Sequence, residues 1–286
     1  MLRMFFFGFT SLLLFTAPAS AQPSDVWTQC AHQQKAPSDS HSGCPTDIPS
    51  GMETQKSAAA YYGSGNAHLS NKDYDRAIAD YDEVIALDPK FAAAYDNRGI
   101  AYQAKRDYDQ AIADHDRAIE LAPKDTLAYW NRGNAYQGKK DYDRAIADYD
   151  KAIELNPKDA VSYALRGLAY NLRGQERNDP SDQDRAIANY TKAIEINPTY
   201  AVAYNNRAWA YFTAGKTLQG LPDVEKSLEL SPNSAHALDT RGRIFEALGR
   251  REEAIADFRR ALSVAPNNAD VQTSGKEALK RLGASP

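Results

Sequence analysis

The chain has 286 residues, 43% of them apolar and 25% charged, which is enough apolar material to bury a sizeable core. The formal net charge is −4, whereas a nucleic-acid groove requires a basic stripe, so binding to nucleic acid is not expected.

The first 21 residues have the pattern of a secretory signal peptide. Arg3 gives a weakly positive start, the apolar run FFFGFTSLLLF follows from Phe5, and Ala19-Ser20-Ala21 has the small-x-small form of a cleavage site. The apolar run is too short for an ordinary spanning helix, although an uncleaved anchor is the alternative. We expect cleavage after residue 21, export to the periplasm or the medium, and no membrane insertion of the mature chain.

The two cysteines, Cys30 and Cys44, both follow this segment. An even cysteine count in an exported chain favours a disulfide bond. His32 and His41 lie between them, so a Cys/His metal site is the alternative, but the spacing fits no common zinc pattern. Residues 22–57 are rich in Ser, Pro and Gln and are predicted to be a loosely ordered lead-in.

A sequence of 17 residues, DYDRAIADYDKAIELNP from Asp141 to Pro157, recurs along most of the remaining chain. The closing prolines lie 34 residues apart within two groups: 89, 123 and 157, then 198, 232 and 266. Such a period indicates a repeat array. We divide it into six units: 58–91, 92–125, 126–159, 160–200, 201–234 and 235–268.

Each unit carries two helical patterns. In the third unit, Asp141 is suited to cap the second helix, because its carboxylate can accept hydrogen bonds from exposed backbone N–H groups. Asp143 lies in the first turn, where the helix dipole favours an acid. The helix must end before Pro157, since the residue preceding a proline leaves the α region.

These units resemble the tetratricopeptide repeat. In the third unit, the residues that match the family signature are Tyr129, Gly133, Tyr136, Ala145, Tyr149 and Pro157. The resemblance covers residues 58–268 and implies an all-α fold, a right-handed α-solenoid superhelix of antiparallel helix pairs. It also implies a concave groove that binds a protein or peptide, with no cofactor and no enzymatic activity.

One departure from the family pattern is a recurring arginine where a packed leucine is usual. An aspartate follows sixteen residues later in most units, and a charge at a packed position needs a partner. We therefore predict a structural Arg–Asp ladder between paired helices, comprising Arg98 with Asp114, Arg132 with Asp148, Arg207 with Asp223, and Arg241 with Asp257. In the fourth unit the acid is replaced by Asn189, so Arg166 should bond elsewhere.

The fourth unit also contains seven extra residues, within Gln175–Asp182. We expect them to lengthen the turn between its two helices, as a solvated insertion or, alternatively, a binding loop. Residues 269–286 follow the last unit and contain a short amphipathic pattern, which is predicted to be the capping helix that a solenoid needs.

By the resemblance, the groove is lined by fixed positions of each first helix. An apolar patch rimmed by asparagines would suit a peptide with apolar anchors, its backbone bonded by the amides. Alternatively, the two tryptophans of this set pack between repeats. The candidate groove residues are Asn66, Asn97, Leu127, Trp130, Asn131, Asn134, Leu165, Leu168, Leu172, Asn205, Asn206, Trp209 and Phe212.

No pattern in the chain indicates catalysis or metal binding. Aspartate pairs such as Asp73/Asp75 recur in register with the repeat, so helix capping explains them better than acid–base chemistry. The sequence therefore predicts an exported, non-enzymatic binding scaffold. The alternative is an assembly subunit of a cell-envelope complex that uses its convex face or its ends.

Overall fold

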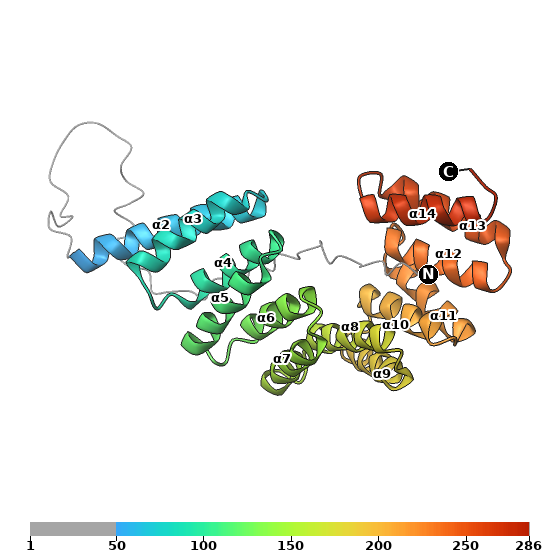
Figure 1. Cartoon of the computed structure of the whole chain (residues 1–286), viewed down its shortest axis with the longest axis horizontal. Helices are drawn as coiled ribbons and strands as arrows, with labels where there is room; N and C mark the ends of the chain where they lie inside the picture. The colour runs from blue at the N-terminus through green and yellow to red at the C-terminus, as the bar shows by residue number, and fades with distance from the viewer. Residues whose placement is uncertain (1–49, 286) are drawn as a thin grey trace.

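In the computed structural model, the residues described are 50–285, and every regular element among them is an α-helix. The predicted signal peptide and the two cysteines lie outside this range. The helices form a curved array that runs from α2 at one end to α14 at the other (Figure 1). The architecture is an all-α solenoid.

Six antiparallel helix pairs and one terminal helix make up this array. The helices are α2 (Ser50–Ser70), α3 (Tyr74–Leu87), α4 (Ala92–Ala104), α5 (Tyr108–Leu121), α6 (Thr126–Gly138), α7 (Tyr142–Leu155), α8 (Ala160–Arg177), α9 (Pro180–Ile196), α10 (Ala201–Thr213), α11 (Thr217–Leu230), α12 (Ala235–Ala247), α13 (Arg251–Val264) and α14 (Ala269–Arg281).

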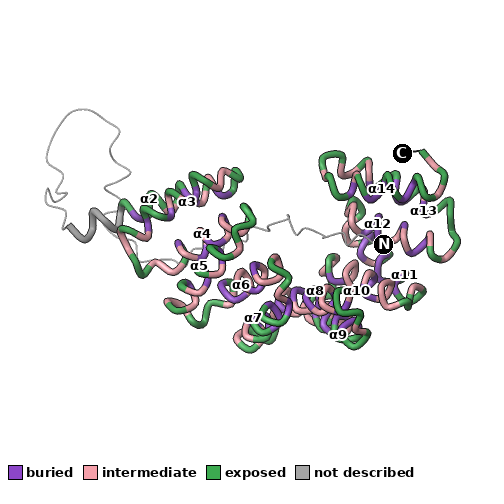
Figure 2. The backbone as a smooth tube through the Cα atoms, viewed as in Figure 1, coloured by how far each residue is buried: buried purple, intermediate pink, exposed green. Residues whose placement is uncertain are grey.

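Two rows of helices give the array its curvature. Each even-numbered helix contacts the next even-numbered helix, whereas the odd-numbered helices make no such contacts with one another in the described chain. The even-numbered helices therefore form an inner row and the odd-numbered helices an outer row, as the arc in Figure 1 shows. Buried residues lie mainly where neighbouring helices face one another, and exposed residues follow the outside (Figure 2).

The second helix of each early repeat begins at an aspartate cap. The Asp73, Asp107 and Asp141 side chains each accept a hydrogen bond from the backbone N–H three residues later, which satisfies an otherwise exposed donor. The turn before the cap needs a positive φ. Lys140 adopts it at 62°, while Gly249 occupies the corresponding place in repeat six at 75°.

Three element boundaries differ from those expected from the sequence. α2 begins at Ser50, so the last residues of the predicted lead-in are helical, consistent with the good helix formers Met52, Glu53, Gln55 and Lys56. The insertion of repeat four does not lengthen the turn. It extends both helices instead, to 18 residues in α8 and 17 in α9, against 13 and 14 in repeat three.

This extension is stabilised by side chains at the new turn. Asn178 ends α8 in the left-handed conformation, and Asp179 caps α9 with Pro180 in its first turn. Asp182 is 1% exposed and accepts hydrogen bonds from Arg173 at 2.7 and 2.8 Å. A buried carboxylate with a bidentate arginine partner fixes the longer helices against one another.

Candidate partner-binding groove

From α4 to α12, each inner helix of a repeat carries an arginine that is surrounded by hydrogen-bond acceptors between the two rows. Arg98 donates from Nε and Nη2 to Asp114 and from Nη1 to Asp82 of the preceding repeat. Its guanidinium also lies over the ring of Tyr95, 5.6 Å from the centroid. Arg132 repeats this arrangement with Asp148 and Asp116.

The later repeats carry variants of the same arrangement. Arg207 bonds Asp223 at 2.7 Å and reaches Thr191 in the preceding repeat, and Arg166 bonds Asn189 and Asp150. Arg241 bonds Asp257 at 2.7 and 2.8 Å. These contacts join helices within and between repeats, so this ladder stabilises the scaffold that carries the groove.

Asparagines of the inner row bond one another and their neighbours across repeats. The Asn97 amide donates to Asn66 at 2.8 Å and to the Tyr62 hydroxyl at 3.0 Å. Asn131 donates to Asp96 at 2.8 Å, and Asn134 accepts from the Tyr149 hydroxyl at 2.7 Å. Each of these amides therefore has part of its bonding capacity engaged within the chain.

The aromatic residues predicted to line the groove are half-buried. Trp130 donates its indole N–H to Ser162 of the next inner helix at 2.5 Å and packs against the apolar cluster around Tyr149. The rings of Trp209 and Phe212 lie 5.3 Å apart, and the guanidinium of Arg243 lies 5.9 Å from the Trp209 ring. Both tryptophans thus connect successive inner helices while retaining part of their surface.

The aliphatic residues of the predicted patch divide into two groups. Leu165 and Leu168 are buried, at 8% and 9% exposure, and belong to the core rather than to an open surface. Their burial has a local cause: Leu165 packs on Tyr149 and Ile146 of α7. Leu127 is 43% exposed, whereas Leu172 is half-buried.

The middle of the inner row contains a further polar pair. Asn205 donates to Asn206 over 3.4 Å, a long and weak bond, and the Asn205 side-chain oxygen is buried without a partner. Buried acceptors of this kind are bonded to water or to a ligand in most proteins. The site therefore offers partly unsatisfied amides beside apolar surface.

Two polar contacts made by inner-row residues were not predicted from the sequence. His115 is fully buried in repeat two, and its Nδ1 bonds Asp96 at 2.8 Å. Ser162 holds the indole of Trp130 and is itself fixed by Asp159. The burial of His115 could have been predicted, because His115 occupies the position held by Tyr81 and Tyr149 in the adjacent repeats.

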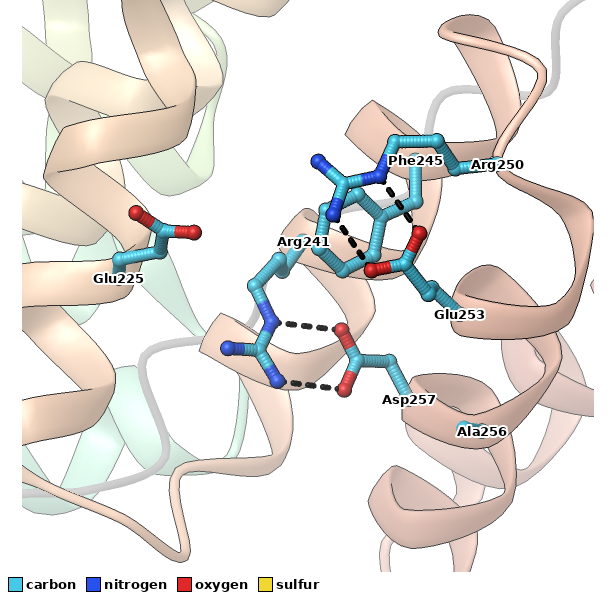
Figure 3. Close-up of a pocket in the computed structure, with 7 residues that line it drawn as sticks. All are labelled: Glu225, Arg241, Phe245, Arg250, Glu253, Ala256 and Asp257. Atoms are coloured by element: carbon cyan, nitrogen blue, oxygen red, sulfur yellow. Dashed lines mark hydrogen bonds and ion pairs between the residues drawn. The ribbon is translucent and has the colours of Figure 1, made fainter.

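A cavity of about 270 Å³ is lined by residues of α11, α12 and α13. Its walls carry charges of both signs, and its two arginines are already bonded: Arg250 to Glu253 and Arg241 to Asp257 (Figure 3). The ring of Phe245 lies between them. This balance of charges favours no particular ligand.

Neither a membrane-spanning helix nor a metal centre is found in residues 50–285. No helix in that range is long and apolar enough to cross a bilayer. In the same range, no group of three or more His, Cys, Asp or Glu side chains is placed to hold a metal ion.

The chain belongs to the tetratricopeptide repeat family. Sequence models of the tetratricopeptide repeat match residues 58–91, 92–125, 127–159 and 235–268. Two others, one described as TPR repeat, match residues 174–215 and 148–178. All of these models describe the repeat, and none describes a catalytic family. No curated protein matches the chain in sequence.

Solved structures of other proteins show the same fold. PilW, described as a widely conserved type IV pilus biogenesis factor, has a TM-score of 0.64 at 20% identity, over 76% of this chain and 97% of PilW. A thermophilic TPR protein from Thermus thermophilus has a TM-score of 0.60 at 20% identity, over 66% and 99%. MamA has a TM-score of 0.52 at 26% identity, over 63% and 95%.

Proposed function

We propose that this protein is a non-enzymatic scaffold that binds a segment of a partner protein along its inner row of helices, from α4 to α10. Tetratricopeptide repeat proteins bind proteins or peptides, and the chain belongs to that family. The inner row also combines apolar surface with amide groups that remain partly unsatisfied. We extend the proposal to exclude nucleic acid as a partner, because the net charge is −4.

The observation that carries this proposal is a repeated aliphatic position on the inner helices. Leu127 and Val202 are each the second residue of their helix, on α6 and α10, and they are 43% and 40% exposed. Val161 holds the same position on α8 and is half-buried. Three successive inner helices thus present one aliphatic side chain each, a spacing that suits a partner with regularly placed apolar anchors.

The asparagines add polar contacts to this apolar series. Asn97 and Asn131 use their N–H groups within the chain and keep their carbonyl oxygens for a partner. Asn134 uses its carbonyl oxygen, which accepts from Tyr149, and keeps its N–H groups. Donors and acceptors are therefore both offered to a partner backbone.

We also propose that the protein acts outside the cytoplasm. The support is the signal-peptide pattern of residues 1–21 and the cysteine pair Cys30 and Cys44, which we expect to form a disulfide in an oxidising compartment. Mass spectrometry of the protein from its natural host tests both points. The expected chain begins after residue 21 and gains two mass units on reduction.

Charge introduced on the inner row tests the site. The double variant Leu127→Glu with Val202→Glu should reduce partner recovery from host envelope extract at least about tenfold. A bound partner would bury each new carboxylate without a counter-charge. Both residues are exposed, so the fold should survive, which circular dichroism checks. Leu218→Glu is the matched control, because Leu218 is 71% exposed but lies on the outer helix α11.

The same pair of variants addresses a second candidate function. Leu218 is a large apolar side chain exposed on the outer row, which favours an assembly contact on the convex face. If Leu218→Glu abolishes recovery while the inner-row variant retains it, the protein acts through its convex face and the groove proposal is wrong.

A further inference from the structure

One interface between neighbouring repeats has a different core from all the others. We call each such interface, including that between repeat six and α14, a joint. Six buried apolar clusters are found in the described chain, and five of the six joints along the array contain at least one of them. None of these clusters contains residues of both repeat two and repeat three. The buried apolar residues at that joint include the alanines 111, 118, 128 and 135, which bury little area.

The cause is a single core position on the second helix of each repeat. Tyr81, Tyr149, Tyr190 and Phe258 occupy it in repeats one, three, four and six, and each belongs to a cluster that reaches the next unit. In repeat two this position is His115. Repeat five has Val224 there, which is also buried in an apolar cluster. In repeat two a polar imidazole therefore replaces the apolar side chain that anchors the inter-repeat core.

Apart from the Tyr108 ring, which lies against Gly138 of repeat three, the joint is held by polar contacts. His115 bonds Asp96 at 2.8 Å, and Asp96 accepts from Asn131 of repeat three at 2.8 Å. Arg132 bonds Asp116, and Lys139 bonds Asp109, but these two acids are 47% and 81% exposed. Exposed ion pairs contribute little to stability.

The buried histidine also lowers the stability of repeat two. Its Nε2 is buried and has no hydrogen-bond partner. In repeats one and three the corresponding tyrosine hydroxyl is satisfied by an asparagine, Asn66 or Asn134, and the equivalent residue in repeat two is Ile100. Repeat two therefore lacks both the apolar ring and the polar partner found on either side.

We propose that the joint between repeats two and three is a hinge that divides the array into two cooperative units, α2–α5 and α6–α14. Repeat arrays behave as chains of units coupled through nearest-neighbour interfaces, so the weakest interface is where cooperativity breaks. The unit α2–α5 opens and swings as one body while the remainder stays folded. Because Asp96 and Asn131 lie on inner helices, this motion changes the curvature of the inner surface.

Native-state hydrogen exchange in low urea tests the hinge on the full mature chain. Core amides of α3 and α5 should exchange together, about tenfold or more faster than those of α7 and α9. The exchange rate should therefore change in a single step between α5 and α7. A smooth gradient from the N-terminal end, or equal protection throughout, would overturn the proposal, because fraying produces a gradient and full cooperativity produces no step.

Two reciprocal variants link the step to the residues named. The triple change Asp96→Asn, Ile100→Asn and His115→Tyr installs the tyrosine–asparagine pair of the adjacent repeats. It should remove the step. Gly99 lies beneath His115 as Gly133 lies beneath Tyr149, so the larger ring has room.

The converse change, Tyr149→His with Asn134→Ile, imports the histidine arrangement into repeat three. It should produce a second step, between α7 and α9. A step that persists unchanged in the first variant and fails to appear in the second would refute the assignment. If the first variant does not fold, the second variant alone tests whether these residues cause the step in exchange rate.

Discussion

Arg132 and Asp148 face each other across the two helices of repeat three, and the arginine donates two hydrogen bonds to the carboxylate, at 2.9 Å from Nε and 2.5 Å from Nη2. Asp148 is only 5% exposed. A third bond from Nη1 reaches Asp116 in repeat two. One guanidinium therefore joins three helices and two repeats.

Removing this arginine should be costly because it leaves a buried carboxylate without its counter-charge. We expect Arg132→Met to lower the free energy of unfolding by about 3–5 kcal/mol in urea denaturation. Lys151→Met is the control, since Lys151 bonds Glu154 on the exposed side of α7 and should change stability by about 0–1 kcal/mol. Equal effects of the two changes would show that the ladder is merely a surface feature.

Glycines at two helical positions should respond oppositely to alanine. A Cβ on Gly133 would lie 2.7 Å from the Tyr149 ring, whereas a Cβ on Gly63 would meet nothing within 4 Å. We expect Gly133→Ala to destabilise by about 1–3 kcal/mol through overpacking. Gly63→Ala should stabilise by about 0.5–1 kcal/mol, because alanine is the better helix former. Thermal unfolding of both variants checks the contrast in sign.

Two buried tyrosines differ in whether the hydroxyl is satisfied. The Tyr149 hydroxyl donates to Asn134, while the Tyr190 hydroxyl is buried without a partner. Tyr149→Phe should therefore cost about 0.5–1.5 kcal/mol, and Tyr190→Phe should be neutral or stabilising. Urea midpoints measure the difference, and a larger loss for Tyr190→Phe would contradict the assigned bonding.

The buried pair in the insertion should make stability depend on pH. Hydrogen bonds from Arg173, and also from Arg185, hold the pKa of Asp182 below its usual value, against the opposing effect of burial. The folded pKa lies below the unfolded value of about 3.9, so the pair stabilises fully above that pH. The contribution is lost as the pH falls through the lower folded pKa.

Asp182→Asn isolates this contribution. The variant should be less stable than the wild type by about 3 kcal/mol at pH 6, and this gap should narrow as the pH falls toward 3. Denaturation at a series of pH values measures the gap. A gap that stays constant with pH would mean that the carboxylate charge contributes nothing.

Much of the fold could be predicted because the repeat encodes it locally. The N-caps at Asp107 and Asp141 and the position of Arg98 opposite Asp114 depend on spacings within one unit. The secondary structure of the insertion in repeat four could not be predicted in this way, since its residues can form either loop or helix. The bond between Arg173 and Asp182, nine residues apart, favours helix.

The groove was less predictable because its surface depends on contacts between units. The family pattern assigns Leu127 and Leu165 to the same surface, but packing against α7 buries Leu165 and leaves Leu127 exposed. Similarly, the pairing of Trp130 with Ser162 joins residues 32 positions apart in different repeats. No local spacing specifies such contacts.

Site-specific photo-crosslinking tests the proposed function most directly. A photoreactive amino acid placed at position 127 on the inner row, or at position 218 on the outer row, would be activated in the natural host. The inner-row proposal predicts a covalent partner adduct from position 127 and none from position 218. An adduct from position 218 alone would contradict it.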